Sequence, residues 1–239
     1  QMCIRDRERT VPFPDYHFLI NPSMYHNGGE YVKTLHEYAL SYARSAGVGT
    51  VFAINNKPSP RLIIVDDFYE NPHLIREFAL QLEYVEDLRY YKGNRSKDNY
   101  RTPQIKQKFE EILGRKITAW DEHGMNGKFQ YCTPQDALVY HWDNQTWAGM
   151  VYLTPDAPYQ SGTSLFAHKE TRARHQSHPG SERAFDGGYY DKSKFELVDT
   201  AGNVFNRLVL FDAHSIHAAN EYFGQTIQDS RLFHLFFFD

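Results

Sequence analysis

The residues best suited to chemistry in this sequence are a histidine and an aspartate one residue apart, His141 and Asp143. They lie at the end of a short run that the pattern predicts to be a strand, and alternate residues of a strand point to the same side. An imidazole and a carboxylate can therefore reach one metal ion from a rigid edge. A further histidine, His217, and an arginine, Arg231, follow on later apolar segments. This order predicts a metal site assembled from distant parts of the chain.

The ligand types narrow the choice of metal. Two neutral imidazoles, one carboxylate and open coordination positions are the arrangement of non-haem Fe(II) oxygenases. The His-x-Asp spacing alone is a weak signal, because a chain with 12 histidines contains such a pair by chance. The context is more specific, since His217 follows the apolar run 207–211 and Arg231 opens the apolar run 232–238. An arginine in that position is costly unless it meets an anion or stays at the surface, and a dicarboxylate would supply the anion.

Two other histidine patterns compete with this assignment. His214 is the alternative distal ligand, and His217 is preferred because the segment from His217 to Arg231 has the arrangement that such a site requires. His168 and Glu170 repeat the His-x-carboxylate spacing. They open a basic stretch and are interpreted as a chance match. Taken singly, each candidate residue is as readily structural as functional, so the prediction rests on their joint order.

The apolar pattern predicts a mainly β (α+β) fold. Hydrophobic residues make up 41% and aromatic residues 15% of the chain, which is enough for a sizeable core. Helical spacing predicts a helix near 31–47, a strand and helix within 61–82, and a second helix that opens at Thr102-Pro103 and ends at Gly114. Eight short strands then fit a double-sheet jelly roll of the cupin-like type. They are expected at Ile117–Trp120, Lys128–Cys132, Ala137–Tyr140, Trp147–Thr154, Thr163–Ala167, Phe195–Leu197, Arg207–Phe211 and Arg231–Phe238.

The domain prediction is a single unit over 8–239. Residues 8–116 are expected to supply supporting helices and strands, and residues 117–239 the jelly-roll core. Residues 1–7 resemble a translated sequencing adapter and are expected to carry no function. The insertion 168–194 is too long for a hairpin turn and is interpreted either as a solvated loop or as a lid over a substrate site.

The insertion is also unusual in composition. It holds His168, His175 and His178, together with four arginines or lysines between 169 and 183. This content favours an acidic or polar substrate if the insertion closes over the site.

The charge and the cysteine content of the chain limit its expected partners and its expected redox environment. The formal net charge is −4 and there is no basic face, so we expect neither a nucleic-acid partner nor binding to a membrane surface. No apolar run approaches the roughly 20 residues of a membrane span. Beyond the doubtful N-terminal stretch the only cysteine is Cys132, which favours a reducing cytoplasm over a disulfide scaffold.

With these residues in view, the sequence from about 127 to 239 resembles the double-stranded β-helix core of Fe(II)/2-oxoglutarate-dependent dioxygenases, particularly their prolyl-hydroxylase-like branch. The resemblance implies that His141, Asp143 and His217 bind Fe(II) and that Arg231 pairs with the distal carboxylate of 2-oxoglutarate. The matching stretches are His141-Trp142-Asp143-Asn144, Val151-Tyr152-Leu153-Thr154, Ser161-Gly162-Thr163, Asn206-Arg207-Leu208-Val209-Leu210-Phe211, His217 and Arg231-Leu232-Phe233.

The same resemblance implies roles for two tyrosines. Tyr152 is similar to a position whose hydroxyl supports the distal carboxylate, and Tyr131 to one that reaches the cosubstrate near the metal. Ser161-Gly162 departs from the Gly-Gly pair that is common in this branch. Asp143 stands where related halogenases carry a small residue, which favours hydroxylation or desaturation over halogenation.

The implied activity couples oxidative decarboxylation of 2-oxoglutarate by O₂ to hydroxylation of a peptidyl side chain, an amino acid or a small metabolite. Two alternatives stay open. The first is a cupin-like metalloenzyme that does not use 2-oxoglutarate. The second is a non-catalytic β-sandwich binding module in which the histidines and the aspartate are structural.

Overall fold

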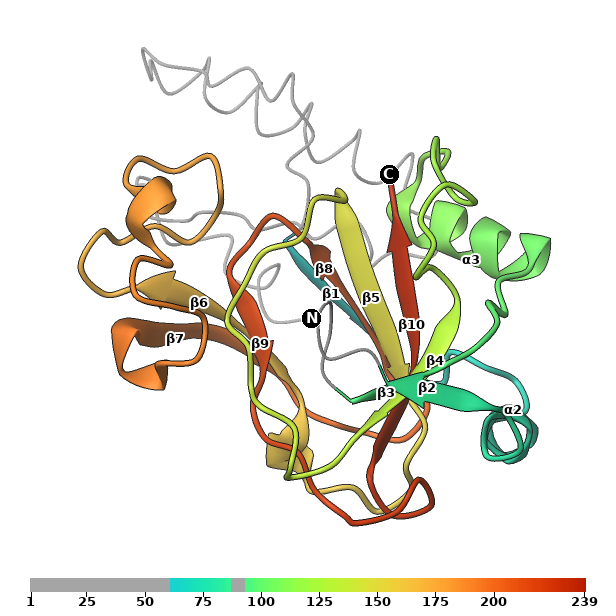
Figure 1. Cartoon of the computed structure of the whole chain (residues 1–239). Coiled ribbons are helices and arrows are strands. Elements are labelled where there is room, and N and C mark those ends of the chain that lie inside the picture. The colour runs from blue at the N-terminus through green and yellow to red at the C-terminus, as the bar shows by residue number, and fades with distance from the viewer. Residues whose placement is uncertain (1–60, 87–92) are drawn as a thin grey trace, which may run out of the picture. The chain divides into compact units, whose positions relative to one another are not determined.

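Two antiparallel β-sheets face each other in the described part of the chain, residues 61–86 and 93–239 of a computed structural model (Figure 1). These residues belong to the unit Pro58–Asp239. The helix predicted near 31–47 and the stretch 1–7 lie outside the described residues. The prediction of one domain over 8–239 stays a prediction.

The larger sheet has the strand order β1-β8-β5-β10-β4-β3-β2, and the smaller sheet has the order β7-β6-β9. Few helices accompany them, so the predicted mainly β, double-sheet fold is confirmed. The strands are β1 (Leu62–Val65), β2 (Tyr84–Glu86), β3 (Asn94–Ser96), β4 (Lys128–Cys132), β5 (Trp147–Tyr152), β6 (Thr163–His168), β7 (Phe195–Ala201), β8 (Leu208–Asp212), β9 (His217–Ala219) and β10 (Arg231–Phe238).

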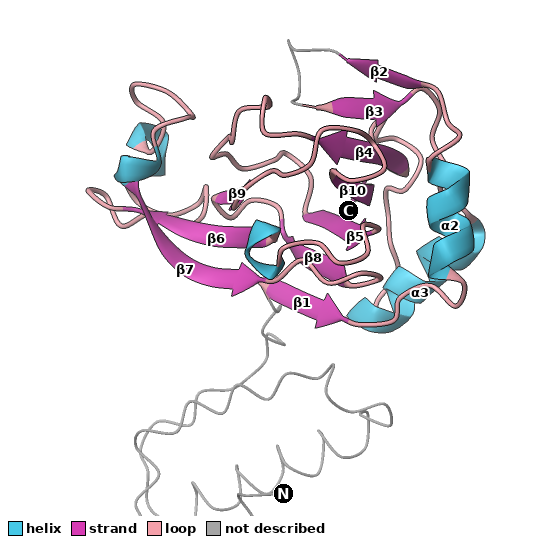
Figure 2. Cartoon of the chain, turned by 90° about the horizontal axis from the view of Figure 1, so that it is seen from below, coloured by secondary structure: helices cyan, strands magenta, loops and turns pink. Residues whose placement is uncertain are grey.

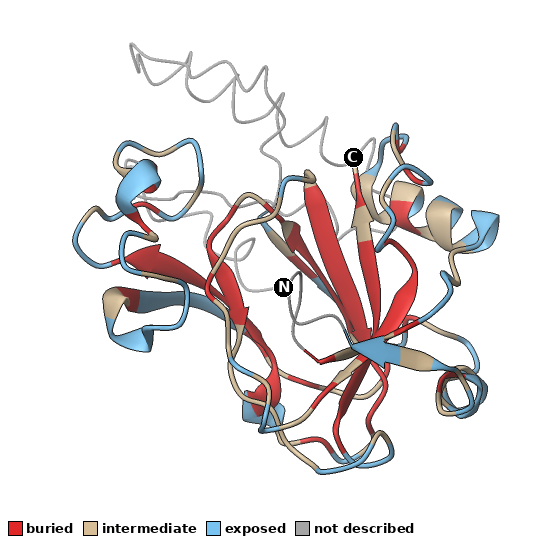
Figure 3. Cartoon of the chain, viewed as in Figure 1, coloured by how far each residue is buried: buried red, intermediate tan, exposed pale blue. Residues whose placement is uncertain are grey.

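The side chains of the central strand β10 alternate between two apolar clusters. Arg231, Phe233 and Leu235 lie on the inner face. There, Phe233 and Leu235 pack with Leu165 of the smaller sheet. Leu232 and Phe236 lie on the outer face with residues of the helices. Most of the large sheet's central strands are buried on both faces, as Figure 3 shows. This explains why β10 is apolar at almost every position, and it leaves Arg231 as a charged residue among apolar neighbours.

Two helices cover the outer face of the larger sheet (Figure 2). Helix α2 (Pro72–Ala79) begins with proline in its first turn, and α3 (Pro103–Leu113) begins at Thr102, whose side chain accepts a hydrogen bond from the Ile105 amide. Helix α3 ends at Gly114 in the left-handed conformation, which costs glycine little. Both predicted helices are confirmed. Neither described helix is long and apolar enough to cross a membrane.

Phe109 of α3 joins the helix to the sheet and offers a test of this core. It is fully buried, and its ring contacts those of Trp120, Phe236 and Phe238 at centroid distances of 4.9–6.0 Å. We expect Phe109→Ala to lower the free energy of unfolding by about 3–5 kcal/mol, measured by urea denaturation. Phe78→Ala is the matched control, because Phe78 is 45% exposed. Equal losses in the two variants would contradict this account of the core.

Two of the predicted strands are wrong. Residues 117–120 form no strand: the Thr118 and Ala119 amides both donate to the Asp239 carbonyl, while the Ile117 amide and the Trp120 carbonyl bond to the side chains of Glu110 and Asn126. Residues 137–140 are irregular, and pairing begins only at His141. Three short strands were not predicted, namely β2, β3 and β9, each of only three residues.

The insertion 168–194 is attached to the core through its middle. The Gln176 amide donates to the His214 carbonyl, and the Ile216 amide donates to the Arg174 carbonyl, both at 2.9 Å. Its charged side chains include Arg172, which pairs with Glu196, and Arg183, which pairs with Glu170. Two of its basic residues are thus neutralised by neighbours at the surface. Its role as a lid stays a prediction.

Candidate metal centre

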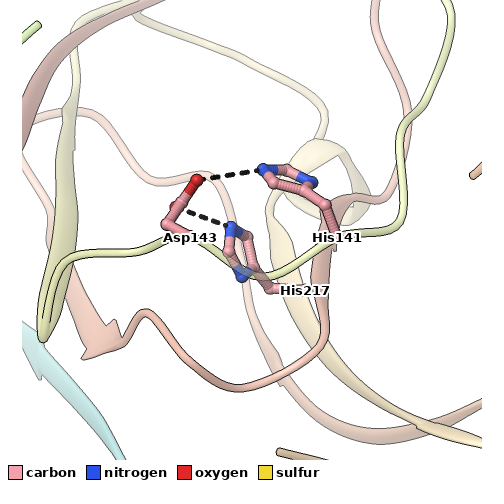
Figure 4. Close-up of side chains that lie close together, drawn as sticks. All are labelled: His141, Asp143 and His217. Atoms are coloured by element: carbon pink, nitrogen blue, oxygen red, sulfur yellow. Dashed lines mark ion pairs between the residues drawn. The ribbon is translucent and has the colours of Figure 1, made fainter. Parts of the chain in front are cut away.

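Three side chains from two segments meet between the sheets (Figure 4). The Asp143 carboxylate lies 3.6 Å from His141 Nε2 through Oδ1 and 3.3 Å from His217 Nε2 through Oδ2. The three candidate ligand atoms all lie within 4.8 Å of one another. Two imidazoles and one carboxylate at this spacing can coordinate one transition-metal ion on one face.

Backbone pairing fixes these residues relative to one another. His141 and His217 exchange two backbone hydrogen bonds, at 3.1 and 2.8 Å, so the segment at His141 extends the smaller sheet beside β9. The Asp143 amide donates to the Ala213 carbonyl at 2.8 Å. On its other side β9 pairs with β6, where His217 lies opposite Leu165. The carboxylate and both imidazoles are therefore held by strand geometry and not by loops alone.

The hydrogen bonds of the rings define which nitrogen carries the proton. His141 Nδ1 lies 3.0 Å from the Val139 carbonyl, and His217 Nδ1 lies 2.9 Å from the Ser215 carbonyl. A carbonyl oxygen only accepts, so each Nδ1 carries a proton and donates it. In the neutral rings both Nε2 atoms then keep a lone pair directed at the Asp143 side. This is the usual way in which an outer hydrogen bond orients a metal-ligating histidine.

The electrostatics keep the groups in the forms that bind a metal. Burial, followed by the neighbouring imidazole of His217, lowers the pKa of His141 to about 4, so the ring is neutral at pH 7. Burial would raise the pKa of Asp143, but its imidazole neighbours lower that pKa overall, so the group is a carboxylate at pH 7. The His141 side chain is 38% exposed, against 7% for His217, which leaves access on the His141 side.

Arg231 lies on the inner face and is 2% exposed. Its Nε donates to the Ser161 carbonyl at 2.9 Å, and an Nη atom donates to Thr163 Oγ1 at 2.9 Å and toward the Tyr152 hydroxyl at 3.4 Å. Its guanidinium also lies over the ring of Phe233, 4.7 Å from the centroid. No carboxylate of the described residues pairs with it. A buried guanidinium held only by neutral groups is a candidate site for an anion.

Strand β6 contacts both Arg231 and the segment that carries His217, so it sets the distance between the arginine and the candidate metal ligands. Thr163, which contacts Arg231, and Leu165, which lies opposite His217, are two residues apart on the same face of that strand. This separation corresponds to roughly 7 Å along the strand. A short dicarboxylate could therefore reach the guanidinium with one end and the metal centre with the other.

The two tyrosines differ in their positions. The Tyr152 hydroxyl is buried and lies 2.8 Å from Thr163 Oγ1, beside Arg231. Tyr131 lies on the outer face, where its ring contacts Tyr84 at 5.1 Å, so the structure does not bring it to the other candidates. The reason is the alternation along β4: its neighbour Cys132 occupies the inner face. Thr163 is the residue that the role assignments missed, although it lies in one of the matching stretches.

The competing histidines lie elsewhere. His168 Nδ1 contacts the Thr171 hydroxyl at 3.0 Å, while Glu170 pairs with Arg183, so this pair does not converge on a common point. His214 groups with His175 and Asp212 instead of with His141.

Comparison with known proteins places the chain in a family. Residues 50–230 match a family described as a family of unknown function, DUF6445, and the chain belongs to it. Curated proteins give no match. Among solved structures, the chain is similar to HygX from Streptomyces hygroscopicus with nickel and 2-oxoglutarate bound, at 12% identity and a TM-score of 0.49, over 74% of this chain and 82% of that chain.

Two prolyl hydroxylases are also similar to this chain. One is a Pseudomonas putida prolyl-4-hydroxylase, at 13% identity and a TM-score of 0.41, over 74% of this chain and 91% of that chain. The other is a Trichoplax adhaerens prolyl hydroxylase in complex with a hypoxia inducible factor peptide fragment, at 12% identity and a TM-score of 0.39, over 88% of this chain and 93% of that chain.

Proposed function

We propose that this chain is an Fe(II)/2-oxoglutarate-dependent dioxygenase that hydroxylates a small-molecule or peptidyl substrate. The observation that carries the proposal is the pairing of two features on one inner face. One is the group His141, Asp143 and His217, whose candidate ligand atoms lie within 4.8 Å of one another. The other is Arg231, a buried cation without a carboxylate partner among the described residues.

The donor set fits iron better than a closed structural ion. Both imidazoles are oriented through Nδ1, and three protein ligands leave positions free for a cosubstrate and O₂. Bound Fe(II), with 2-oxoglutarate and O₂, would supply the oxidising chemistry. Zinc in a closed tetrahedral site would require a fourth protein ligand, and the group contains three.

The part played by the protein follows from its own side chains. His141, Asp143 and His217 would fix the metal on one face, while Arg231 would pair with the distal carboxylate of 2-oxoglutarate. Thr163 and Tyr152 would add hydrogen bonds to that carboxylate. Because Arg231, Thr163 and Tyr152 are buried and lie on strands, they are organised before the cosubstrate binds, which lowers the cost of ordering them. Substrate would enter on the His141 side, where the site is exposed.

A matched pair of variants tests the position of the cosubstrate. Thr163→Val removes the hydroxyl beside Arg231 while preserving the shape of the side chain. We expect it to weaken 2-oxoglutarate binding by about 10-fold, which corresponds to the loss of one hydrogen bond to a charged group. Tyr131→Phe removes a hydroxyl on the opposite face and is expected to leave the affinity unchanged.

The measurement is anaerobic titration of the Fe(II)-loaded protein with 2-oxoglutarate, followed by tryptophan fluorescence. If the two variants lost affinity equally, the proposed placement of the carboxylate would be wrong. If neither the wild type nor any variant bound 2-oxoglutarate, the cupin-like alternative that does without this cosubstrate would be favoured.

A further inference from the structure

A second group of metal-binding side chains lies outside the centre described above. It consists of His175, from the insertion 168–194, together with Asp212 and His214, from the end of β8 and the turn that follows. Its candidate ligand atoms also lie within 4.8 Å of one another. All three side chains are mostly buried, with 14–24% of their surfaces exposed. The proposed dioxygenase chemistry uses none of them.

The spacing within this group suits ligands around an ion better than direct hydrogen bonds. His175 Nε2 lies 3.3 Å from Asp212 Oδ2, and His214 Nδ1 lies 3.6 Å from Asp212 Oδ1. A direct bond between a charged imidazole and a carboxylate is shorter, about 2.7–2.9 Å. Nitrogen and oxygen ligands at about 2.0–2.1 Å from a tetrahedral zinc ion lie roughly 3.3 Å from each other. The corresponding separations at Asp143 are 3.6 and 3.3 Å, so the two groups are equally open.

The protonation of His214 supports a cation at this point. Its Nε2 lies 3.3 Å from the Asn144 carbonyl, which can only accept, so Nε2 carries the proton. In the neutral ring, Nδ1 then presents a lone pair to Asp212 Oδ1. Two acceptors facing each other are unfavourable unless a proton or a metal ion lies between them, and the convergence of three ligand atoms on one point favours the metal ion.

His175 has to change tautomer to bind through Nε2. At present its Nδ1 accepts from the Ser177 amide at 3.1 Å, which places the proton on Nε2. The Ser177 hydroxyl lies closer to the same Nδ1, at 2.7 Å, and can accept the Nδ1 proton when Nε2 is taken by a metal. Ser177 is exposed, so water can replace the bond that its amide would lose. The change is therefore inexpensive.

The two halves of the group are already joined by the backbone. His175 pairs with Ser215 in an isolated antiparallel bridge, flanked by the two hydrogen bonds that link residues 174 and 176 to residues 216 and 214. The same turn leads into His217, and the Ser215 carbonyl is the acceptor that orients the His217 ring. An ion at this point would fasten the insertion to the segment that carries the distal histidine of the first centre.

We propose that His175, Asp212 and His214 form a second divalent-metal site, in which water completes the coordination and the ion fixes the insertion 168–194 to the core; Zn(II) serves as the probe. The site is independent of the dioxygenase proposal, because it shares no ligand with His141, Asp143 and His217.

The test is the number of zinc ions bound per chain. The full-length protein is stripped with a chelator, dialysed against Zn(II) and measured by inductively coupled plasma mass spectrometry, with folding checked by circular dichroism. We expect two ions in the wild type, one in His175→Ala, one in His217→Ala and none in the double variant. His73→Ala, an exposed histidine on α2, is the matched control and is expected to retain two.

A second variant distinguishes loss of the metal site from loss of the fold. Asp212→Asn preserves the size of the side chain but removes its charge. We expect it to weaken zinc binding at the second site by more than about 100-fold, because loss of a residue that only orients a ligand costs at most about 100-fold. Zinc should also raise the melting temperature of His217→Ala but not that of the variant that additionally carries Asp212→Asn. A wild type that binds a single ion, with the same number retained in His175→Ala and Asp212→Asn, would overturn the proposal.

Discussion

Replacing Arg231 by methionine is expected to weaken 2-oxoglutarate binding by about 30-fold to several thousand-fold. This range corresponds to the roughly 2–5 kcal/mol that the loss of one partner of a buried charge pair costs. Arg231 is 2% exposed and has no carboxylate partner among the described residues, so the cosubstrate is proposed to be its counter-ion. The measurement is the dissociation constant of 2-oxoglutarate for the Fe(II)-loaded protein without oxygen.

The stability of this variant separates binding from folding. Methionine relieves the cost of burying a charge, while the Ser161 carbonyl and the Thr163 hydroxyl lose a donor. These effects oppose each other, so the free energy of unfolding without ligand is expected to change by no more than about 1–2 kcal/mol. A folded Arg231→Met variant that binds 2-oxoglutarate with wild-type affinity would remove the arginine from the proposed site.

Replacing His217 by alanine is expected to abolish iron binding at the first centre and, with it, 2-oxoglutarate turnover. His217 supplies one of three proposed ligands. Loss of a residue that only orients a ligand lowers metal affinity by about 10- to 100-fold, so the loss of a ligand itself should lower iron affinity further. The residue is 5% exposed, so the deletion also leaves a small cavity between the sheets. Iron affinity under anaerobic conditions and succinate formation in air are the two measurements.

His168→Gln is the control for this experiment. His168 is the other histidine with a His-x-carboxylate spacing, but its Nδ1 contacts the Thr171 hydroxyl and its neighbour Glu170 pairs with Arg183. We expect this variant to bind iron as the wild type does. Loss of iron in His168→Gln with retention in His217→Ala would reverse the assignment of the metal ligands.

The long apolar strands could be predicted from the sequence, because a strand that is buried on both faces has apolar residues at almost every position. Strand β10 has the predicted bounds, Arg231–Phe238, and so does β4, Lys128–Cys132. The three-residue strand β9 could not be predicted, since three residues show no period and its pairing depends on distant partners. The predicted strand at 137–140 failed for the same reason, because its partner reaches it only at His141.

The candidate site could be predicted in part. The sequence order of His141, Asp143 and His217 was sufficient to nominate three residues that the fold brings together. Tyr131 was nominated by the family resemblance, but strand alternation turns it to the outer face, and no local pattern reveals which of Tyr131 and Cys132 faces inward. The second group, with His175 in an insertion and Asp212 at a strand end, depends on a contact between segments that sequence spacing does not encode.

The central claim, that the first centre binds Fe(II) and 2-oxoglutarate together, is tested most directly by visible absorption without oxygen. Fe(II) is added to the metal-free protein, then 2-oxoglutarate, with His141→Ala and Arg231→Met measured alongside. We expect a metal-to-ligand charge-transfer band in the wild type, no band in His141→Ala, and a band in Arg231→Met only at much higher 2-oxoglutarate concentration. Iron bound without a band would contradict the use of 2-oxoglutarate, and no iron bound at all would favour a non-catalytic binding module.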